Sequence, residues 1–267
     1  IDWGEKFTYV LADGSSFRWL KIEDYNMFGV MCAGTKKTKY MKQDYSRMDI
    51  VIGDKSQGNL QNKTVEEYKD KINLSVGIEC GLEPRFADRI NKLMSSYEFD
   101  FVIGSSHVIN GRDPYYKEYF ENRPVHDAMV EYLESIIENI LIFNDFDVYG
   151  HLDYMMRYAP VSPEEKRYNY NEYGELFDKI LTTLISKGKG IEINTSPLRS
   201  GLTDTNPNMQ VIKRYKELGG KIITIGSDAH KPEDVGANFN DAKKLLIDAG
   251  FSHFNVFSGR KALEITI

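Results

Sequence analysis

Short apolar runs alternate with amphipathic stretches from about residue 64 to the end of the chain. The helical spacing is clearest at 125–142, where Met129, Leu133, Ile136 and Ile140 fall on one face. By the same criterion helices are expected at 83–98, 125–142, 175–186, 208–218 and 241–249, and a shorter one begins at a capping box of Thr64 and Glu67. Buried strands are expected at 74–79, 99–104, 146–150, 190–194, 221–226 and 253–257.

This alternation of strands and helices predicts repeated βαβ units around a parallel sheet. Six or more units in a chain of 267 residues favour a closed or nearly closed barrel, with an open doubly wound sheet as the alternative. The open sheet loses weight because the chain has neither the glycine-rich dinucleotide fingerprint nor a P-loop. We therefore predict a single α/β domain over residues 1–267.

The first 63 residues follow the alternation less regularly and form a divergent N-terminal portion of this domain. Strands are expected at 6–11 and 30–34, and a helix at 18–29. The basic and polar stretch 35–49 is typical of a solvated loop or a surface helix.

Charge and composition exclude several classes of partner. The chain has 34 basic and 40 acidic residues, a net charge of −6, so a general nucleic-acid binder is not expected. No run approaches 18 apolar residues and no signal peptide is visible, so we expect no membrane association. The two cysteines, Cys32 and Cys80, form no metal-ligand pattern and no disulfide framework, and a reducing cytoplasm is the expected location. The oligomeric state stays open.

Five side chains of metal-binding type follow the expected strands: Glu79, His107, His151, Asp228 and His230. In a barrel the carboxyl ends of the strands share one face, so these side chains are expected to converge there. Each has a plain structural interpretation by itself, such as an ion pair or a helix cap. Together they offer three imidazoles and two carboxylates, the ligands of Zn²⁺, Mn²⁺ or Fe²⁺, and they predict an open, catalytic site.

Two arginines lie shortly after strand ends, Arg157 beyond the third of these strands and Arg199 beyond the fourth. A guanidinium group binds phosphate oxygens bidentately, although a surface ion pair is an equal alternative for each residue. Arginines beside a metal cluster indicate hydrolysis of an anionic ester, most simply a small-molecule phosphate monoester.

Several segments are similar to the PHP (polymerase and histidinol phosphatase) superfamily, most of all to its histidinol-phosphatase-like branch. The similarity covers roughly residues 64–260. It is carried by GIECG (77–81), GSSH (104–107), GHLDYMMRY (150–158), EINTSPLRSG (192–201) and GGKIITIGSDAH (219–230).

The resemblance implies a distorted TIM-like (β/α)7 barrel with one to three divalent metal ions, and dephosphorylation of L-histidinol phosphate in histidine biosynthesis. Glu79, His107, His151, Asp228 and His230 would be metal ligands. Arg157 and Arg199 would bind the substrate phosphate. Catalysis would involve His151, Asp228 and His230, with His151 or His230 assisting proton transfer.

The chain departs from the family pattern near its N-terminus, because no histidine precedes His107. The family carries an HxH pair on its first strand and a further histidine after its second. Alignment of ADG (12–14) with the family's turn places Lys6 and Thr8 at the HxH positions. A protonated lysine cannot bind a metal, so we expect at most two well-held ions and a reduced phosphatase rate. Lys6 could instead offer its ammonium group to the phosphate.

Two functions of different classes follow from these patterns. The first is a metal-dependent phosphatase of the histidinol-phosphatase type. The second is a non-catalytic or impaired relative that keeps the barrel and binds an anionic ligand. A nuclease or a DNA-polymerase-associated module is disfavoured by the acidic charge.

Overall fold

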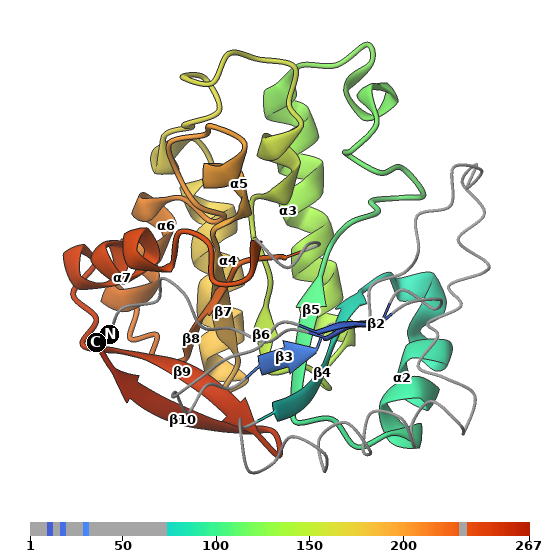
Figure 1. Ribbon diagram of the computed structural model, residues 1–267. Helices are drawn as coiled ribbons and strands as arrows, with labels where there is room; N and C mark the ends of the chain where they lie inside the picture. The colour runs from blue at the N-terminus through green and yellow to red at the C-terminus, as the bar shows by residue number, and fades with distance from the viewer. Residues whose placement is uncertain (1–9, 13–16, 20–28, 32–73, 230–233) are drawn as a thin grey trace.

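A six-stranded parallel sheet forms the centre of the computed structural model, which describes residues 10–12, 17–19, 29–31, 74–229 and 234–267 (Figure 1). The strands are hydrogen-bonded in the order β3-β4-β5-β6-β7-β8, and every neighbouring pair is parallel. Their bounds are Gly29–Met31, Leu74–Gly81, Phe101–Ser105, Val148–Tyr149, Gly190–Asn194 and Ile223–Gly226. Within the described ranges β3 and β8 are the two edges of this sheet.

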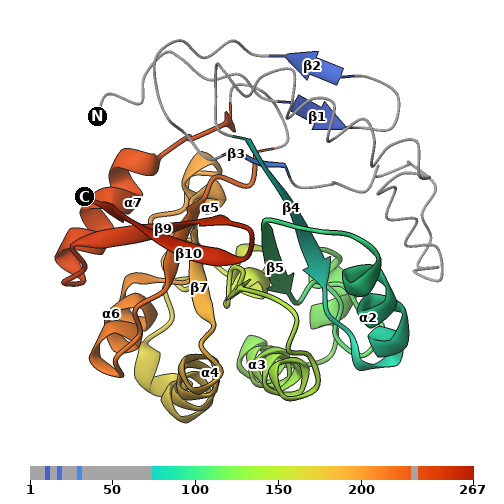
Figure 2. The same ribbon diagram turned by 90° about the horizontal axis from the view of Figure 1, so that it is seen from below.

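Helices cover the outer face of the sheet. Figure 2 shows α2, α3, α4, α6 and α7 in an arc around the strands. The α-helices are α2 (Ala87–Ser96), α3 (Val125–Ile142), α4 (Gly174–Ser186), α5 (Ser196–Arg199), α6 (Met209–Glu217) and α7 (Phe239–Asp248). Four short 3-10 helices are η2 (Pro84–Phe86), η3 (Lys117–Phe120), η4 (Tyr154–Arg157) and η5 (Tyr170–Glu172). None of the described helices is both long and apolar enough to cross a bilayer.

The main core lies between the sheet and these helices. Helix α3 buries the stripe that includes Met129, Leu133, Ile136 and Ile140, as its spacing predicted. One polar residue of α3 is buried as well: Asn139 donates hydrogen bonds to the Leu82 carbonyl oxygen at 2.9 Å and to Ser106 Oγ at 3.0 Å. These bonds tie the helix to the carboxyl ends of β4 and β5, where a buried amide needs partners.

An antiparallel hairpin lies across the amino ends of the strands (Figure 2). It consists of β9 (His253–Ser258) and β10 (Lys261–Thr266). The ring of Phe257 stacks on Phe101 at 4.7 Å between centroids, and Ser75 Oγ donates to the Phe257 carbonyl oxygen at 3.2 Å. Arg260 donates to Asp147 at 2.8 Å. The hairpin therefore covers the amino ends of the strands with apolar and charged contacts. The carboxyl ends of the strands, on the opposite side, are left for a functional site.

The expected elements agree with the structure over most of the described chain. The helix at 125–142 and the strand at 190–194 have the expected bounds. The expected helix 83–98 begins with the 3-10 turn η2 instead, which has Pro84 at its first position. Strand β10 was not anticipated. Its side chains are mostly exposed, so it lacks the apolar run of a buried strand.

The helix expected at 18–29 is wrong where the structure describes it. Residues Phe17–Trp19 form β2, which pairs antiparallel with β1 (Val10–Ala12). The alternation of Phe17, Arg18 and Trp19 has the two-residue period of a strand, and that local pattern prevails. The expected strand at 30–34 is confirmed at its start by β3, whereas the helix after Thr64 and the stretch 35–49 lie outside the described residues.

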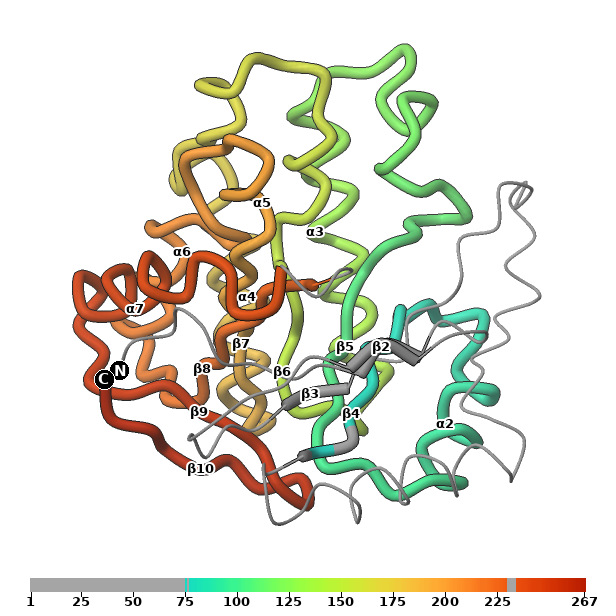
Figure 3. Tube along the Cα trace, viewed as in Figure 1, coloured from blue at the N-terminus to red at the C-terminus, as the bar shows by residue number. Residues whose placement is uncertain are grey.

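The segments that follow β5, β6 and β7 gather at one end of the molecule, as the tube in Figure 3 shows. They comprise residues 106–124, 151–173 and 195–208. Because parallel strands all point the same way, the side chains just after each strand meet at this end. The candidate site is there.

Candidate metal centre and active site

Three side chains from adjacent strands form the centre of the site. Glu79 lies near the end of β4, His107 follows β5, and His151 follows β6. Glu79 Oε1 is 3.0 Å from His151 Nε2 and 3.4 Å from His107 Nε2. One potential ligand atom from each residue lies within 4.8 Å of the other two, a spacing that could hold one metal ion.

The three groups influence one another's proton affinity. Burial would raise the pKa of the Glu79 carboxyl, but the two imidazoles outweigh it and hold that pKa well below its usual range. Burial lowers the pKa of His107. Burial also works to lower the pKa of His151, but its hydrogen bond to Glu79 prevails and raises it. The Glu79 carboxylate is therefore ionised, and His107 favours its neutral form. Both groups then present the lone pairs that a cation needs.

A buried ring nitrogen of His151 bears directly on whether a cation fits this site. His151 is buried, and its Nδ1 atom has no hydrogen-bond partner among the described residues. A buried polar atom without a partner is costly, and a metal ion or an ordered water would satisfy it. The mixed nitrogen and oxygen donors are those that Zn²⁺, Mn²⁺ and Fe²⁺ accept.

The backbone is strained at two of the sequence-predicted residues. His151 has a φ angle of 26° and Asp228 has a φ angle of 49°. Both lie in the left-handed region that residues other than glycine rarely adopt. A Cβ at Gly150, just before His151, would lie 3.0 Å from the Ile103 side chain and 3.3 Å from that of Glu192, which is tighter than an ordinary van der Waals contact. Such strain is concentrated at functional sites in proteins.

Arg157 points into the site and is not on the surface. Its side chain is 13% exposed, and its Nη1 donates to Asp228 Oδ2 at 3.3 Å. Its Nη2 donates to Asn206 Oδ1 at 3.2 Å and to Asn194 Oδ1 at 3.4 Å. Of the two interpretations given for this arginine, the surface ion pair does not match its position.

Arg199 is held differently. Its guanidinium group donates to the carbonyl oxygens of Ser227 and Asp228, the latter at 3.0 Å, and its Nε lies 3.5 Å from Asp234 Oδ1. These contacts brace the strained turn that carries Asp228. The structure therefore brings both arginines to the Asp228 turn, one through the side chain of that residue and one through its backbone.

A buried carboxyl group that the sequence did not single out lies beneath the site. Glu192 of β7 is 5% exposed, and it accepts a hydrogen bond from Asn194 Nδ2 at 3.4 Å. Burial, together with the carboxylates of Glu79 and Asp228, raises the pKa of Glu192 to about 7. The sequence does contain a signal for Glu192, because it is a charged residue between Ile191 and Ile193 on an otherwise apolar strand. Successive side chains of a strand point to opposite faces, so Glu192 lies on the inner face.

Replacement of this carboxyl should change how stability depends on pH. Glu192 keeps its proton in the folded chain up to about pH 7, whereas an unfolded glutamate ionises near pH 4.5. Stability is therefore lost as the pH rises between these values. We expect Glu192→Gln to stabilise the chelator-treated protein by up to about 3 kcal/mol at pH 8 and far less at pH 4.5. Urea unfolding at the two pH values measures this. An equal effect at both would contradict it, and the exposed Glu217→Gln is the control.

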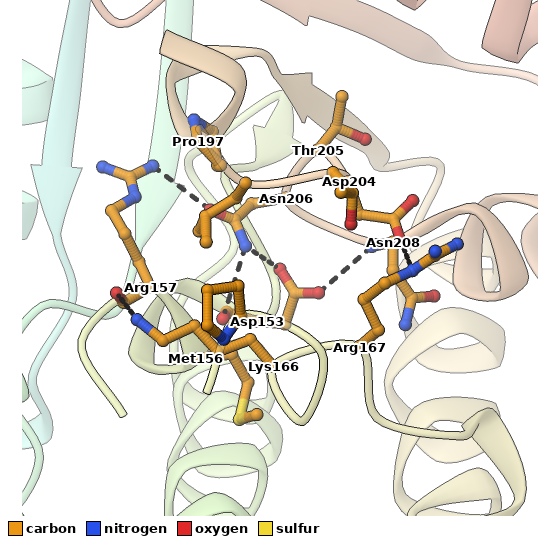
Figure 4. Close-up of a pocket in the computed structure, with 13 residues that line it drawn as sticks. Asp153, Met156, Arg157, Lys166, Arg167, Pro197, Asp204, Thr205, Asn206 and Asn208 are labelled. Atoms are coloured by element: carbon orange, nitrogen blue, oxygen red, sulfur yellow. Dashed lines mark hydrogen bonds and ion pairs between the residues drawn. The ribbon is translucent and has the colours of Figure 1, made fainter. Parts of the chain in front are cut away.

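A buried polar chain supports Arg157 from behind (Figure 4). Asn206, which accepts from Arg157, in turn donates through Nδ2 to Asp153 Oδ1. Asp153 also accepts from the Tyr168 hydroxyl at 2.8 Å and from the Asn208 backbone N–H at 3.1 Å. Burial raises the pKa of Asp153 to about 6. A small pocket next to Arg157 is lined by Asp153, Asn206 and Asn208 and by Lys166 and Pro197.

The other residues that the sequence analysis considered are His230, Lys6 and two further histidines. His230 and Lys6 lie outside the described residues. The His126 side chain is 56% exposed beside Asp127 at the start of α3, and His253 Nε2 lies 3.2 Å from the Lys221 carbonyl oxygen. Neither of these histidines belongs to the cluster of Glu79, His107 and His151.

Comparison with known proteins agrees with this geometry. The PHP domain family matches residues 49–196, more than half of the chain. This chain belongs to the PHP domain family. A histidinol-phosphatase of Lactococcus lactis is 35% identical over 201 residues, which are 75% of this chain and 74% of the relative. A probable histidinol-phosphatase of Thermotoga maritima is 29% identical over 210 residues, 76% of this chain and 78% of the relative.

Comparison with solved structures supports the same relationship to histidinol phosphatases. A crystal structure of histidinol phosphate phosphatase from Lactococcus lactis, in complex with zinc, L-histidinol and phosphate, superposes with a TM-score of 0.68 at 33% identity. The alignment covers 77% of each chain. The resemblance to the histidinol-phosphatase-like branch is thereby confirmed, as is the TIM-like α/β fold class. A structure from Listeria monocytogenes, at 18% identity and a TM-score of 0.60, supports the fold alone.

Proposed function

We propose that this PHP domain protein is a metal-dependent phosphoric monoester hydrolase. It converts L-histidinol phosphate and water to L-histidinol and phosphate, a step of histidine biosynthesis. The observation that carries the proposal is one carboxylate oxygen of Glu79 within 3.0 and 3.4 Å of two imidazole nitrogens. The names of the relatives and the ligands of the Lactococcus lactis structure support the substrate.

We assign the metal site to Glu79, His107 and His151, together with Asp228 and His230 from the strand β8 region. It would hold one to three divalent ions, with zinc favoured because the structural relative contains it. A bound divalent ion polarises a phosphoryl oxygen and lowers the pKa of a water molecule that it holds. The orphaned Nδ1 of His151 and the mixed donor set support such an ion.

The protein's own groups would bind and orient the ester. Arg157 provides a guanidinium fork for the phosphoryl oxygens, and Asp228 and Asn206 hold that fork in place. Arg199 and Lys6 are proposed as further phosphate ligands. As the oxygen of water joins phosphorus and the bond from phosphorus to the ester oxygen breaks, the departing alkoxide needs a proton. We assign that transfer to His151 or His230, with Asp228 also in the catalytic group.

The second function, a relative that binds an anion without hydrolysing it, is not favoured. Its motivation is the absence of any histidine before His107. A chain selected only for anion binding has no need of a carboxylate held between two imidazoles, and the curated relatives are named phosphatases.

Metal analysis and a phosphate-release assay test the proposal together. Purified protein should contain bound divalent metal and should release phosphate from L-histidinol phosphate. Treatment with a chelator should reduce the rate at least about 100-fold, and Zn²⁺ or Mn²⁺ should restore it. Protein that carries metal but releases no phosphate would contradict the proposed activity, and protein without metal at saturating Zn²⁺ would contradict the site.

Two further assignments accompany this function. We propose that residues 1–267 form one PHP-type domain, with 1–63 as its divergent N-terminal portion. We also propose the cytoplasm as its location, since a small-molecule biosynthetic substrate is expected there. No nucleic acid or membrane partner is proposed.

A further inference from the structure

Asp153 is a buried carboxylate that joins two loops behind the site. It follows β6 and is 2% exposed. Its Oδ2 accepts from the Tyr168 hydroxyl at 2.8 Å and from the Asn208 backbone N–H, in the segment after β7, at 3.1 Å. Its Oδ1 accepts from Asn206 Nδ2. Each partner donates, as an ionised carboxylate requires, because such a group can only accept.

The side-chain amide of Asn206 has a different partner at each end (Figure 4). Its Nδ2 donates to Asp153, and its Oδ1 accepts from Arg157 Nη2 at 3.2 Å. The backbone of Asn206 is held as well, since its N–H and C=O pair with those of Asn194 at 3.0 and 2.8 Å. With the backbone held and an acceptor at one end, the amide oxygen must face Arg157.

This orientation of the amide matters for Arg157. If the Asn206 amide turned round, it would present N–H groups to a guanidinium group, which has donors only. The Nε of Arg157 is buried and has no hydrogen-bond partner among the residues that the structure describes. The plane of the guanidinium group is therefore set by the contacts of Nη1 with Asp228 and of Nη2 with Asn206 and Asn194.

The group of Asp153, Asn206 and Arg157 is separate from the cluster that could hold a metal ion. That cluster consists of Glu79, His107 and His151. The Asp153 carboxylate is engaged with Asn206, Tyr168 and Asn208 instead. A role of Asp153 in orienting Arg157 should therefore affect the binding of an anion and leave the binding of a cation unchanged.

We propose that Asp153 is a positioning residue that acts through Asn206 and sets the orientation of the Arg157 guanidinium fork for phosphate. The inference rests on the proposed function, in which Arg157 binds the phosphate of the substrate. A planar fork binds phosphate oxygens bidentately only in a narrow range of orientations, so its alignment contributes to affinity.

Calorimetric titration of the metal-loaded full chain with inorganic phosphate tests the proposal without any hydrolysis. Asp153→Asn keeps the shape of the side chain but can place a donor opposite Asn206, so the Asn206 amide is free to turn. The Kd for phosphate should rise at least about tenfold, whereas the Kd for Zn²⁺ should change by no more than about twofold. Asp153→Ala also frees the amide, without a buried donor, and gives the same expectation if Asp153→Asn does not fold.

A double-mutant cycle distinguishes positioning from a general structural role. In the Arg157→Met background, Asp153→Asn should change the Kd for phosphate by no more than about twofold, because the group on which Asp153 acts is gone. The matched control is Asp147→Asn in the parent. Asp147 is also a buried aspartate, accepts from the Val102 backbone N–H at 2.8 Å and pairs with Arg260 at the amino ends of the strands. This control should leave the Kd for phosphate within about twofold of the parent.

Three results would overturn the proposal. They are an unchanged phosphate affinity in Asp153→Asn, an equal weakening of Zn²⁺ and phosphate, and the same loss of phosphate affinity with and without the Arg157 side chain. A parent protein that does not bind phosphate overturns it as well. If the parent shows the coupling between Asp153 and Arg157 but does not hydrolyse L-histidinol phosphate, the phosphatase function fails and the positioning role stands.

Discussion

Replacement of Glu79 by glutamine should remove bound metal and reduce phosphatase activity at least about 100-fold. Gln has nearly the same shape as Glu, so the packing around β4 is preserved. It lacks the negative charge that two imidazoles hold at Glu79, and its amide offers a metal only one weak oxygen ligand. Metal content per chain and the initial rate with L-histidinol phosphate measure the two effects.

Glu83→Gln is a suitable control for Glu79→Gln. Glu83 lies four residues further along, its carboxylate pairs with Arg85 at 2.8 Å, and it is not part of the cluster of Glu79, His107 and His151. This change removes the same charge and should leave both metal content and rate close to those of the parent. A Glu79→Gln protein that keeps its metal and its activity would mean that the Glu79 cluster is a structural ion pair.

Replacement of Arg157 by methionine should lower kcat/KM for L-histidinol phosphate about 100-fold or more. Methionine keeps much of the length of the side chain but provides no donor for phosphate, and it leaves Asp228 and Asn206 without the guanidinium group. The affinity for inorganic phosphate, measured as product inhibition, should fall in parallel. Arg157→Lys keeps the charge but loses the bidentate fork, so an intermediate loss is expected.

Arg167→Met separates this effect from a general loss of positive charge. Arg167 lies ten residues further on in the same loop, is 60% exposed, and pairs with Asp204 at 3.0 Å. We expect its substitution to change kcat/KM by no more than about twofold. If Arg157→Met changes neither KM nor phosphate inhibition, the guanidinium group serves only to hold Asp228 in place.

The strands and helices of residues 74–267 could be read from the sequence because their signals are local. The stripe of α3 and the apolar run of β7 have the periods that their elements require. An element whose stability comes from a partner strand gave no such signal. The side chains of β10 are mostly exposed and the strand is held by pairing with β9, so it was not predicted.

The candidate site was likewise predicted from the sequence only in part. The rule that parallel strands end at one face was enough to select Glu79, His107 and His151, which come from three adjacent strands. The sequence could not distinguish the roles of Arg157 and Arg199, because each simply follows a strand end. Only the folded chain shows that Arg157 contacts the side chain of Asp228, whereas Arg199 donates to its backbone.

The sequence by itself determined the order of strands and helices, the family resemblance and the kinds of ligand at the strand ends, because these depend on side-chain chemistry and short-range periodicity. Only the tertiary structure decided which groups face one another: Glu192 near the candidate metal site, Asn206 behind Arg157, and Tyr115 beside Tyr158. The reason is that these contacts join residues far apart in the chain. Their distances are set by the packing of the sheet and its loops, which no local pattern encodes.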